Sequence, residues 1–72
     1  MGGFDGKVAL VTGGGSGLGE AIGKLLAARG ARVVLSDIEL QAAQRVAAEI
    51  AKAGGSASAV HQDTAMPALF TA

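Results

Sequence analysis

A glycine-rich segment directly follows a short apolar run near the start of this chain, and it limits the folds that the chain can adopt. Residues 7–12 (Lys-Val-Ala-Leu-Val-Thr) are mostly apolar without alternation, which is typical of a strand covered on both faces of a parallel sheet. Residues 13–19 (Gly-Gly-Gly-Ser-Gly-Leu-Gly) are too rich in glycine to extend that strand. The apolar residues that follow recur with helical spacing and predict an amphipathic helix over residues 17–29. Its apolar face consists of Leu18, Ala21, Ile22, Leu25 and Leu26.

The remainder of the chain repeats this alternation. Residues 31–36 predict a second strand, residues 39–53 a second amphipathic helix that ends at Gly54-Gly55, and residues 56–61 a weaker third strand. Strands that alternate with helices of this length form a βαβαβ unit, whose right-handed crossovers make the strands parallel. The sequence therefore predicts an α/β fold with three parallel strands in the order 3-2-1 and flanking helices. We expect a single partial domain over residues 1–72.

Two further expectations concern the end of the chain and the edge of the sheet. The segment after Asp63-Thr64 is expected to begin another helix, because Pro67 is tolerated in a first helical turn. The first strand, residues 8–12, would then lie at the sheet edge without charge or proline to protect it. We therefore expect the chain to self-associate, or to be completed by a complementing chain, through this strand.

The composition argues against several classes of function. Six basic residues balance six acidic ones, which argues against binding to nucleic acid or to a membrane surface. The longest apolar stretches are Val8-Ala9-Leu10-Val11 and Leu25-Leu26-Ala27-Ala28, far below the ~18 residues of a membrane span. There is no cysteine for a disulfide or a metal site, and we assign no metal site. Because the N-terminus lacks a signal-like apolar segment, we expect a cytoplasmic location.

The glycine-rich turn is suited to a phosphate-bearing ligand. Glycine permits positive φ angles, lets the backbone approach a ligand closely, and lets the helix pack tightly on the strand. The first amides of the following helix have no partner within the helix and lie at the positive end of its dipole. A pyrophosphate is stabilised at such a position.

An acidic residue at the end of the second strand makes this interpretation more specific. Asp37 lies 18 residues after Gly19, at the carboxyl end of the neighbouring parallel strand. Its carboxylate can accept hydrogen bonds from both ribose hydroxyls of an adenosine, and it repels a 2′-phosphate. NAD(H) is therefore favoured over NADP(H), as the absence of Arg and Lys at positions 14–16 and 36–40 also indicates. Ile38 is expected to lie against one face of the adenine.

The spacing Thr12-Gly13-x-x-x-Gly17-x-Gly19 resembles that of the short-chain dehydrogenase/reductase family, and the resemblance extends through Asp37 to Asp63-Thr64. It implies a Rossmann-like fold and an NAD-dependent oxidoreductase that transfers hydride between NAD and an alcohol or ketone. It also implies the cofactor-binding residues: Gly13, Ser16, Gly17, Leu18 and Gly19 for the pyrophosphate, Asp37 and Ile38 for the adenosine ribose and ring, and Asp63 and Thr64 for the adenine.

The chain departs from this family in what it lacks. Family members carry an Asn-Asn-Ala-Gly segment, a Ser that polarises the substrate oxygen, and a Tyr-x-x-x-Lys pair whose Tyr transfers the proton. This chain contains neither Tyr nor Asn, so we assign no catalytic residue and expect no turnover from this chain alone. We expect a fragment or truncation that holds the dinucleotide without the catalytic part. The alternative is an autonomous nucleotide-binding or assembly module without turnover.

Several positions keep a second interpretation. Asp37 can instead N-cap the second helix, Asp63 can cap a helix that follows it, and Ser16 can bond the turn backbone rather than phosphate. A Rossmann-like methyltransferase also uses a glycine turn and an acidic second strand, but the Thr12-Gly13 spacing argues against it. A hydrolase triad around His61 and a kinase-type P-loop are disfavoured, because neither a nucleophile elbow nor Gly-Lys-Ser/Thr is present.

Overall fold

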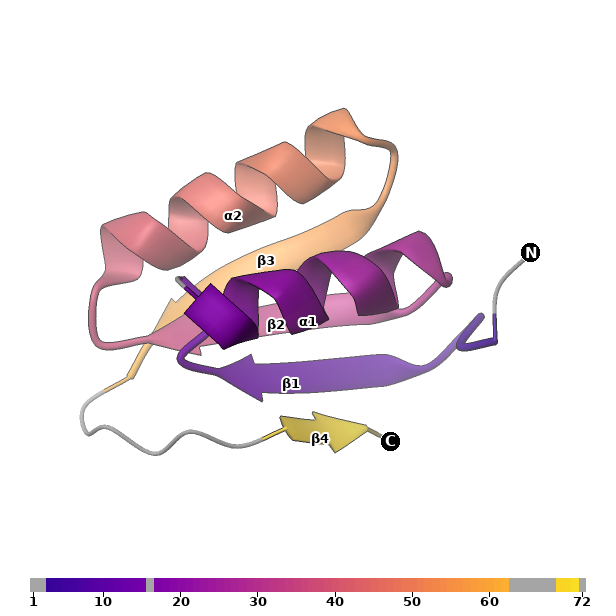
Figure 1. Cartoon of the computed structure of the whole chain (residues 1–72), viewed down its shortest axis with the longest axis horizontal. Helices are drawn as coiled ribbons and strands as arrows, with labels where there is room; N and C mark the ends of the chain where they lie inside the picture. Colours follow the sequence, from indigo (N-terminus) through magenta and orange to yellow (C-terminus); the bar gives the residue numbers. More distant parts are fainter. Residues whose placement is uncertain (1–2, 16, 63–68, 72) are drawn as a thin grey trace.

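The described part of the chain folds into one sheet with two helices (Figure 1). The computed structural model describes residues 3–15, 17–62 and 69–71. In chain order the elements are β1 (Val8–Thr12), α1 (Gly17–Ala28), β2 (Arg32–Asp37), α2 (Leu40–Lys52), β3 (Ser56–His61) and β4 (Leu69–Thr71). In the described part of the chain, no helix is both long and apolar enough to cross a membrane.

The sheet has the strand order β3-β2-β1-β4, and β1, β2 and β3 are parallel. Val11 of β1 lies opposite Leu35 of β2, which lies opposite Ala59 of β3. The connection from β1 to β2 and the connection from β2 to β3 step in the same direction across the sheet. Because connections between parallel strands are right-handed, α1 and α2 lie on the same face of the sheet. The predicted fold class, three parallel strands in the order 3-2-1 with flanking helices, is confirmed.

The prediction that β1 forms a free edge of the sheet is wrong. The antiparallel strand β4 pairs with it, with Leu10 opposite Phe70 and Val11 opposite Leu69. The predicted helix is absent from residues 69–71, while residues 63–68, including Pro67, lie outside the described residues. An apolar edge strand leaves a row of amide and carbonyl groups without partners, and a short strand satisfies part of that row whereas a helix would not.

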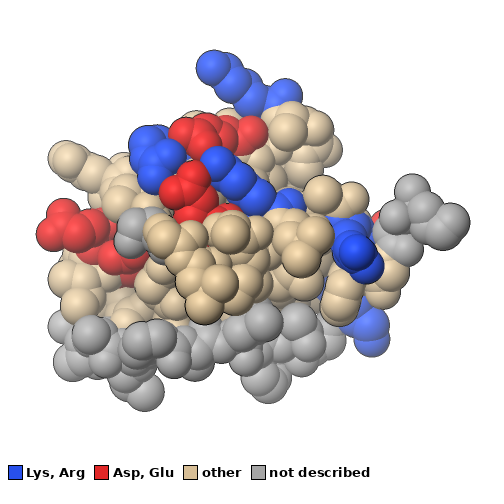
Figure 2. All heavy atoms as spheres, viewed as in Figure 1, with Lys and Arg blue, Asp and Glu red and all other residues tan. Residues whose placement is uncertain are grey.

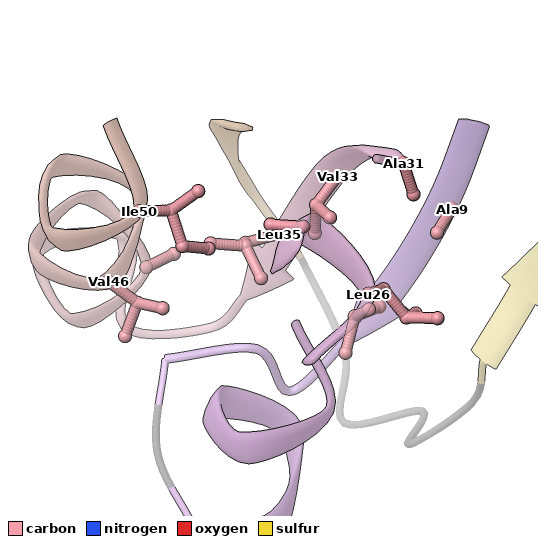
Figure 3. Packing of buried hydrophobic residues seen from close by; sticks show 10 residues of the cluster. Ala9, Leu26, Ala31, Val33, Leu35, Val46 and Ile50 are labelled. Carbon is pink, nitrogen blue, oxygen red and sulfur yellow. The ribbon is translucent and has the colours of Figure 1, made fainter. Parts of the chain in front are cut away.

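The core lies between the helices and the covered face of the sheet (Figure 3). Val46 and Ile50 project from α2 toward Leu35 on β2, and all three side chains are buried. Leu35 lies on the face of β2 that every second residue shares, and Val46 and Ile50 are four residues apart on one face of α2. The remaining members of the buried cluster are Ala9, Val11, Leu26, Ala27, Ala31, Val33 and Ala43.

The face of α1 that packs on the sheet agrees with the predicted one in part, because Leu26 is buried and Ile22 packs against the core. Its buried residues are Gly23, Leu26 and Ala27, whereas Leu18 and Leu25 are 77% and 54% exposed. A Cβ atom at Gly23 would lie 2.8 Å from Leu35 Cδ2, so a larger residue at this position would force the helix away from the sheet. The helix therefore turns its small residues toward the sheet, and part of the expected apolar face points outward.

Candidate functional site

The carboxyl ends of β1 and β2 bring the glycine-rich turn and Asp37 together at one edge of the sheet. Figure 1 shows the parallel strands ending on the same side, where the turn after β1 and the start of α2 lie. The backbone amide of Gly15 donates a hydrogen bond to Asp37 Oδ2 at 2.8 Å. The amides of Gly13 and Gly14 both donate to the carbonyl oxygen of Ser36, at 2.6 and 3.0 Å. Three consecutive amides therefore fix the turn to the end of β2.

The glycines of the turn are required by both conformation and space. Gly13 has φ +73°, a left-handed conformation that glycine adopts at little cost. A Cβ atom at Gly19 would collide with the carbonyl oxygen of Gly13, so only glycine lets α1 start this close to the turn. A Cβ atom at Gly15 would lie 2.6 Å from Ala42 Cβ and 2.7 Å from Asp37 Oδ2. The turn is consequently packed against both helices and β2.

The start of α1 lies at the outside of this turn. Gly17 and Leu18, the first residues of the helix, are both exposed, and Gly17 has φ +55°. The first amides of a helix have no partner within the helix, so this end of α1 can donate hydrogen bonds to an anion. Ser16, the remaining predicted residue of the turn, lies outside the described residues.

Asp37 is half-buried and joins two loops. Its Oδ1 atom accepts a hydrogen bond from the amide of Glu39 at 2.9 Å, while Oδ2 accepts the bond from Gly15. The N-cap residue of α2 is Glu39, so Asp37 does not occupy the N-cap position that the second interpretation gave it. A carboxylate oxygen has two acceptor sites, and one protein bond to each oxygen leaves capacity for two further donors, such as a pair of hydroxyl groups.

The residues around Asp37 complete the description of this edge. Ile38 is exposed beside it. The end of β3 bonds to the end of β2 at this edge. The backbone amide of Gln62 donates to the Asp37 carbonyl oxygen at 2.9 Å, and Ser36 Oγ donates to the side-chain oxygen Oε1 of Gln62 at 3.0 Å. Asp63 and Thr64, predicted to meet the adenine, lie outside the described residues.

Sequence reasoning missed Arg45, which reaches the turn from α2. Its Nη2 atom donates to the Gly15 carbonyl oxygen at 3.3 Å and to Glu20 Oε1 at 3.0 Å, and its Nη1 atom donates to Glu49 Oε2 at 2.9 Å. Arg45 lies 30 residues from Gly15 in the sequence, so no local spacing could have indicated this contact.

Arg45 belongs to a ring of four charges that joins α1 to α2, which we call the ion-pair ring: Glu20, Lys24, Arg45 and Glu49. Lys24 Nζ lies 2.7 Å from Glu20 Oε2 and 2.6 Å from Glu49 Oε1, so each base pairs with both acids. Figure 2 shows acidic and basic side chains gathered on the face formed by the helices. Hydrogen bonds from Arg45 and then Lys24 lower the pKa of Glu20 from 4.5 to about 2.

An open groove of about 430 Å³ lies between the C-terminal halves of the two helices. Small apolar residues such as Ala27 and Ala53 line it, and its charged residues, Lys24 and Glu49, pair with each other. The charged side chains of the groove pair with each other, whereas the glycine-rich turn adjoins the Asp37 carboxylate and the N-terminus of α1, so the turn is the stronger candidate site.

Known proteins are similar to this chain in both sequence and fold. The family model described as short chain dehydrogenase matches residues 7–70. Cyclohexanol dehydrogenase from Acinetobacter sp. (strain SE19) is 53% identical over 64 residues, which are 89% of this chain and 26% of that protein.

Two solved structures extend the comparison. A metagenomic short-chain oxidoreductase in complex with NADP matches with a TM-score of 0.81 and 42% identity, over 83% of this chain and 27% of that one. A 7α-hydroxysteroid dehydrogenase complexed with NADH and 7-oxo glycochenodeoxycholic acid matches with a TM-score of 0.78 and 47% identity, over 79% of this chain and 22% of that one. The chain thus spans about a quarter of the length of these relatives. Because the family model covers nearly all of its residues and the fold agrees, this chain belongs to the short-chain dehydrogenase family.

Proposed function

We propose that this chain is the NAD(H)-binding N-terminal segment of an oxidoreductase that transfers hydride between NAD and an alcohol or ketone. The observation that carries the proposal is the Asp37 carboxylate at the end of β2, hydrogen-bonded to the Gly15 amide in the adjoining turn. An anion-binding turn and a ribose-binding carboxylate at neighbouring strand ends are what an adenine dinucleotide requires. Solved relatives bound to NADP and to NADH support a nicotinamide dinucleotide as the ligand.

The individual roles follow the same division of the ligand. The glycine-rich turn would line the pyrophosphate, and backbone amides in the first turn of α1 would donate to it, because the amides of Gly13, Gly14 and Gly15 already bond to β2. Asp37 would hold the adenosine ribose, and Ile38 would contact the adenine ring. The proposed pyrophosphate residues are Gly13, Ser16, Gly17, Leu18 and Gly19, and the proposed adenine residues are Asp63 and Thr64.

Charge at the ribose end supports NAD rather than NADP. A 2′-phosphate placed against the Asp37 carboxylate would be repelled. Arg45 is the cation that contacts this turn, but its guanidinium group pairs with Glu20 and Glu49, which balance its charge. The site therefore offers the 2′ position an acidic group rather than a free cation.

These 72 residues alone would bind the dinucleotide without turning over a substrate. The Tyr-x-x-x-Lys pair of the family cannot be present in a chain without Tyr, so proton transfer to or from the substrate oxygen lacks its usual donor. We propose a cytoplasmic location for the protein. The alternative function is a nucleotide-binding or assembly module that acts without hydride transfer.

Calorimetric titration with NADH and with NADPH tests the cofactor assignment. We expect NADH to bind more tightly than NADPH, and Asp37→Ala to weaken NADH binding about tenfold or more, since hydrogen bonds to a charged group contribute ~1.5–3 kcal/mol. Asp37→Asn keeps one acceptor oxygen and removes the charge, so it should narrow the difference between NADH and NADPH.

Glu39→Gln is the matched control, because it removes a negative charge two residues away and leaves the bond between Asp37 and Gly15 in place. Its NADH affinity should stay within about twofold of the parent. Tighter binding of NADPH than NADH would contradict the cofactor assignment. Absence of binding to both would favour the assembly alternative.

A further inference from the structure

We infer that Arg45 is a positioning residue for the dinucleotide site: from α2 it holds the Gly15 carbonyl and thereby the conformation of the glycine-rich turn. This inference rests on the proposed function. Arg45 lies outside the glycine motif and would act through the turn rather than by contact with the ligand.

Charged side chains bond to both backbone polar groups of Gly15. Its amide donates to the carboxylate of Asp37 at 2.8 Å, and its carbonyl oxygen accepts from the guanidinium of Arg45 at 3.3 Å. Hydrogen bonds to ionised groups are stronger than those between neutral groups, and of these two bonds the one to Asp37 is short while the one from Arg45 is long. Because a peptide group is planar, holding this oxygen also fixes the plane of the peptide that leads toward α1.

Gly15 has no side chain whose packing could restrict its backbone conformation. The space where a Cβ atom would lie is filled by Ala42 and Asp37, so the position tolerates only glycine. Glycine has more conformational freedom to lose than any other residue, and external contacts must therefore fix its backbone. Arg45 and Asp37 supply these contacts from two different elements.

Arg45 also connects the turn to α1, the helix that would bind the phosphates. The same Nη2 atom that reaches Gly15 also lies 3.0 Å from Oε1 of Glu20, in the first turn of α1. Nη1 is anchored by Glu49 one turn further along α2. A single guanidinium group therefore contacts α2, the turn and the start of α1 and fixes their relative positions. These positions decide the direction of the backbone amides in the first turn of α1.

Lys24 provides a matched control within the same ring. It pairs with the same two carboxylates, Glu20 and Glu49, and both basic side chains are partly exposed. Among the described residues, Arg45 bonds to the turn and Lys24 does not. Lys24→Ala and Arg45→Ala each remove two ion pairs, so they separate loss of the ring from loss of the contact with Gly15.

The experiment compares the parent chain with Arg45→Ala, Arg45→Lys and Lys24→Ala. We expect Arg45→Ala to raise the Kd for NADH about three- to tenfold, Arg45→Lys to restore part of the affinity, and Lys24→Ala to stay within about twofold. The amide chemical shifts of Gly14 and Gly15 in NMR spectra should move in Arg45→Ala and stay in place in Lys24→Ala. Melting temperatures should fall by similar amounts in both alanine variants.

Equal effects of Arg45→Ala and Lys24→Ala on both the Kd and the Gly15 amide would overturn the inference, since the ring would then act only through stability. If the parent chain does not bind NADH, the proposed function fails, and the amide shifts still decide whether Arg45 positions the turn. Arg45→Lys keeps the charge, and it provides a folded comparison in the event that Arg45→Ala unfolds.

Discussion

Gly19 makes the closest approach between the first helix and the glycine-rich turn. A Cβ atom there would collide with the Gly13 carbonyl oxygen, which is backbone and cannot rotate away. We expect Gly19→Ala to destabilise the chain by ~1–3 kcal/mol, as overpacking does, and to weaken NADH binding by moving the start of α1. Urea unfolding and NADH titration measure the two effects.

Gly54→Ala is the control for this substitution. Gly54 has φ +92° and open space around its Cβ position, so alanine adds backbone strain of about 1 kcal/mol there, far from the turn. Its NADH affinity should remain that of the parent chain. A Gly19→Ala variant as stable as the parent would show that a methyl group fits between α1 and the Gly13 carbonyl oxygen, and would contradict this prediction.

Single residues differ in how far the sequence alone could place them. Asp37 and the glycines were predictable because each lies at a fixed distance from a strand end, and the strand ends of a parallel sheet meet at one edge. Arg45 was not predictable, since its contact with Gly15 depends on how α2 packs beside α1. The second interpretation of Asp37 needed the structure as well, because only the observed start of α2 shows that Glu39 is the N-cap.

At the scale of elements, the ion-pair ring makes the contact between α1 and α2 sensitive to acid. The pKa of Glu20 is about 2 in the folded chain and 4.5 for an ordinary glutamate, so the unfolded chain binds the proton more readily. The stabilisation is therefore complete above about pH 4.5 and is lost as the pH falls toward about 2. The pKa of Glu49 is also lowered, by hydrogen bonds from Lys24 and then Arg45, and acts in the same direction.

We expect the melting temperature of the parent chain to fall steeply over this pH range and that of Glu20→Gln to fall less, because the variant has one fewer carboxylate to protonate. Circular dichroism melts between pH 2 and 7 measure the difference. Added salt should reduce it, since these side chains are partly exposed and screened. Parallel curves for the two proteins would contradict a role for Glu20 in acid stability.

The elements themselves were predictable where the pattern was long and repeated. α2 keeps one apolar face over 13 residues, and its buried residues Ala43, Val46 and Ile50 lie on that face. β4 spans three residues, too short for any period to emerge, and its partner β1 lies at the other end of the chain. In α1 the pattern of large apolar residues placed Ile22 and Leu26 correctly against the core. It also included Leu18 and Leu25, which are exposed because small residues form part of the buried face.

At the scale of the whole molecule, the two faces of the sheet are unequal. Both helices cover one face, where Ala9 and Val11 are buried. Val8 and Leu10 alternate with these residues and point to the other face, and Val60 lies in register with Thr12 on that same face. These three side chains are between 36% and 43% exposed. Polar residues, Arg32, Ser56 and Ser58 among them, share this face by register, so the exposed Val and Leu side chains are what it offers for contact with a second copy of the chain.

The oligomeric state of the 72-residue chain tests this argument. Because β4 occupies the edge of β1, we expect association through the sheet face opposite the helices rather than through pairing with β1. Sedimentation velocity at micromolar concentrations should show dimers or larger species for the parent chain and monomers for Val8→Lys combined with Val60→Lys, since two buried charges in an interface cost more than its apolar area returns. Leu25→Lys is the control: Leu25 is 54% exposed, on α1, so its substitution should leave association unchanged. If Leu25→Lys alone converted the dimers to monomers, the contact would lie on the helices instead. A monomeric parent chain would mean that the exposed apolar side chains of this face are too few to drive association.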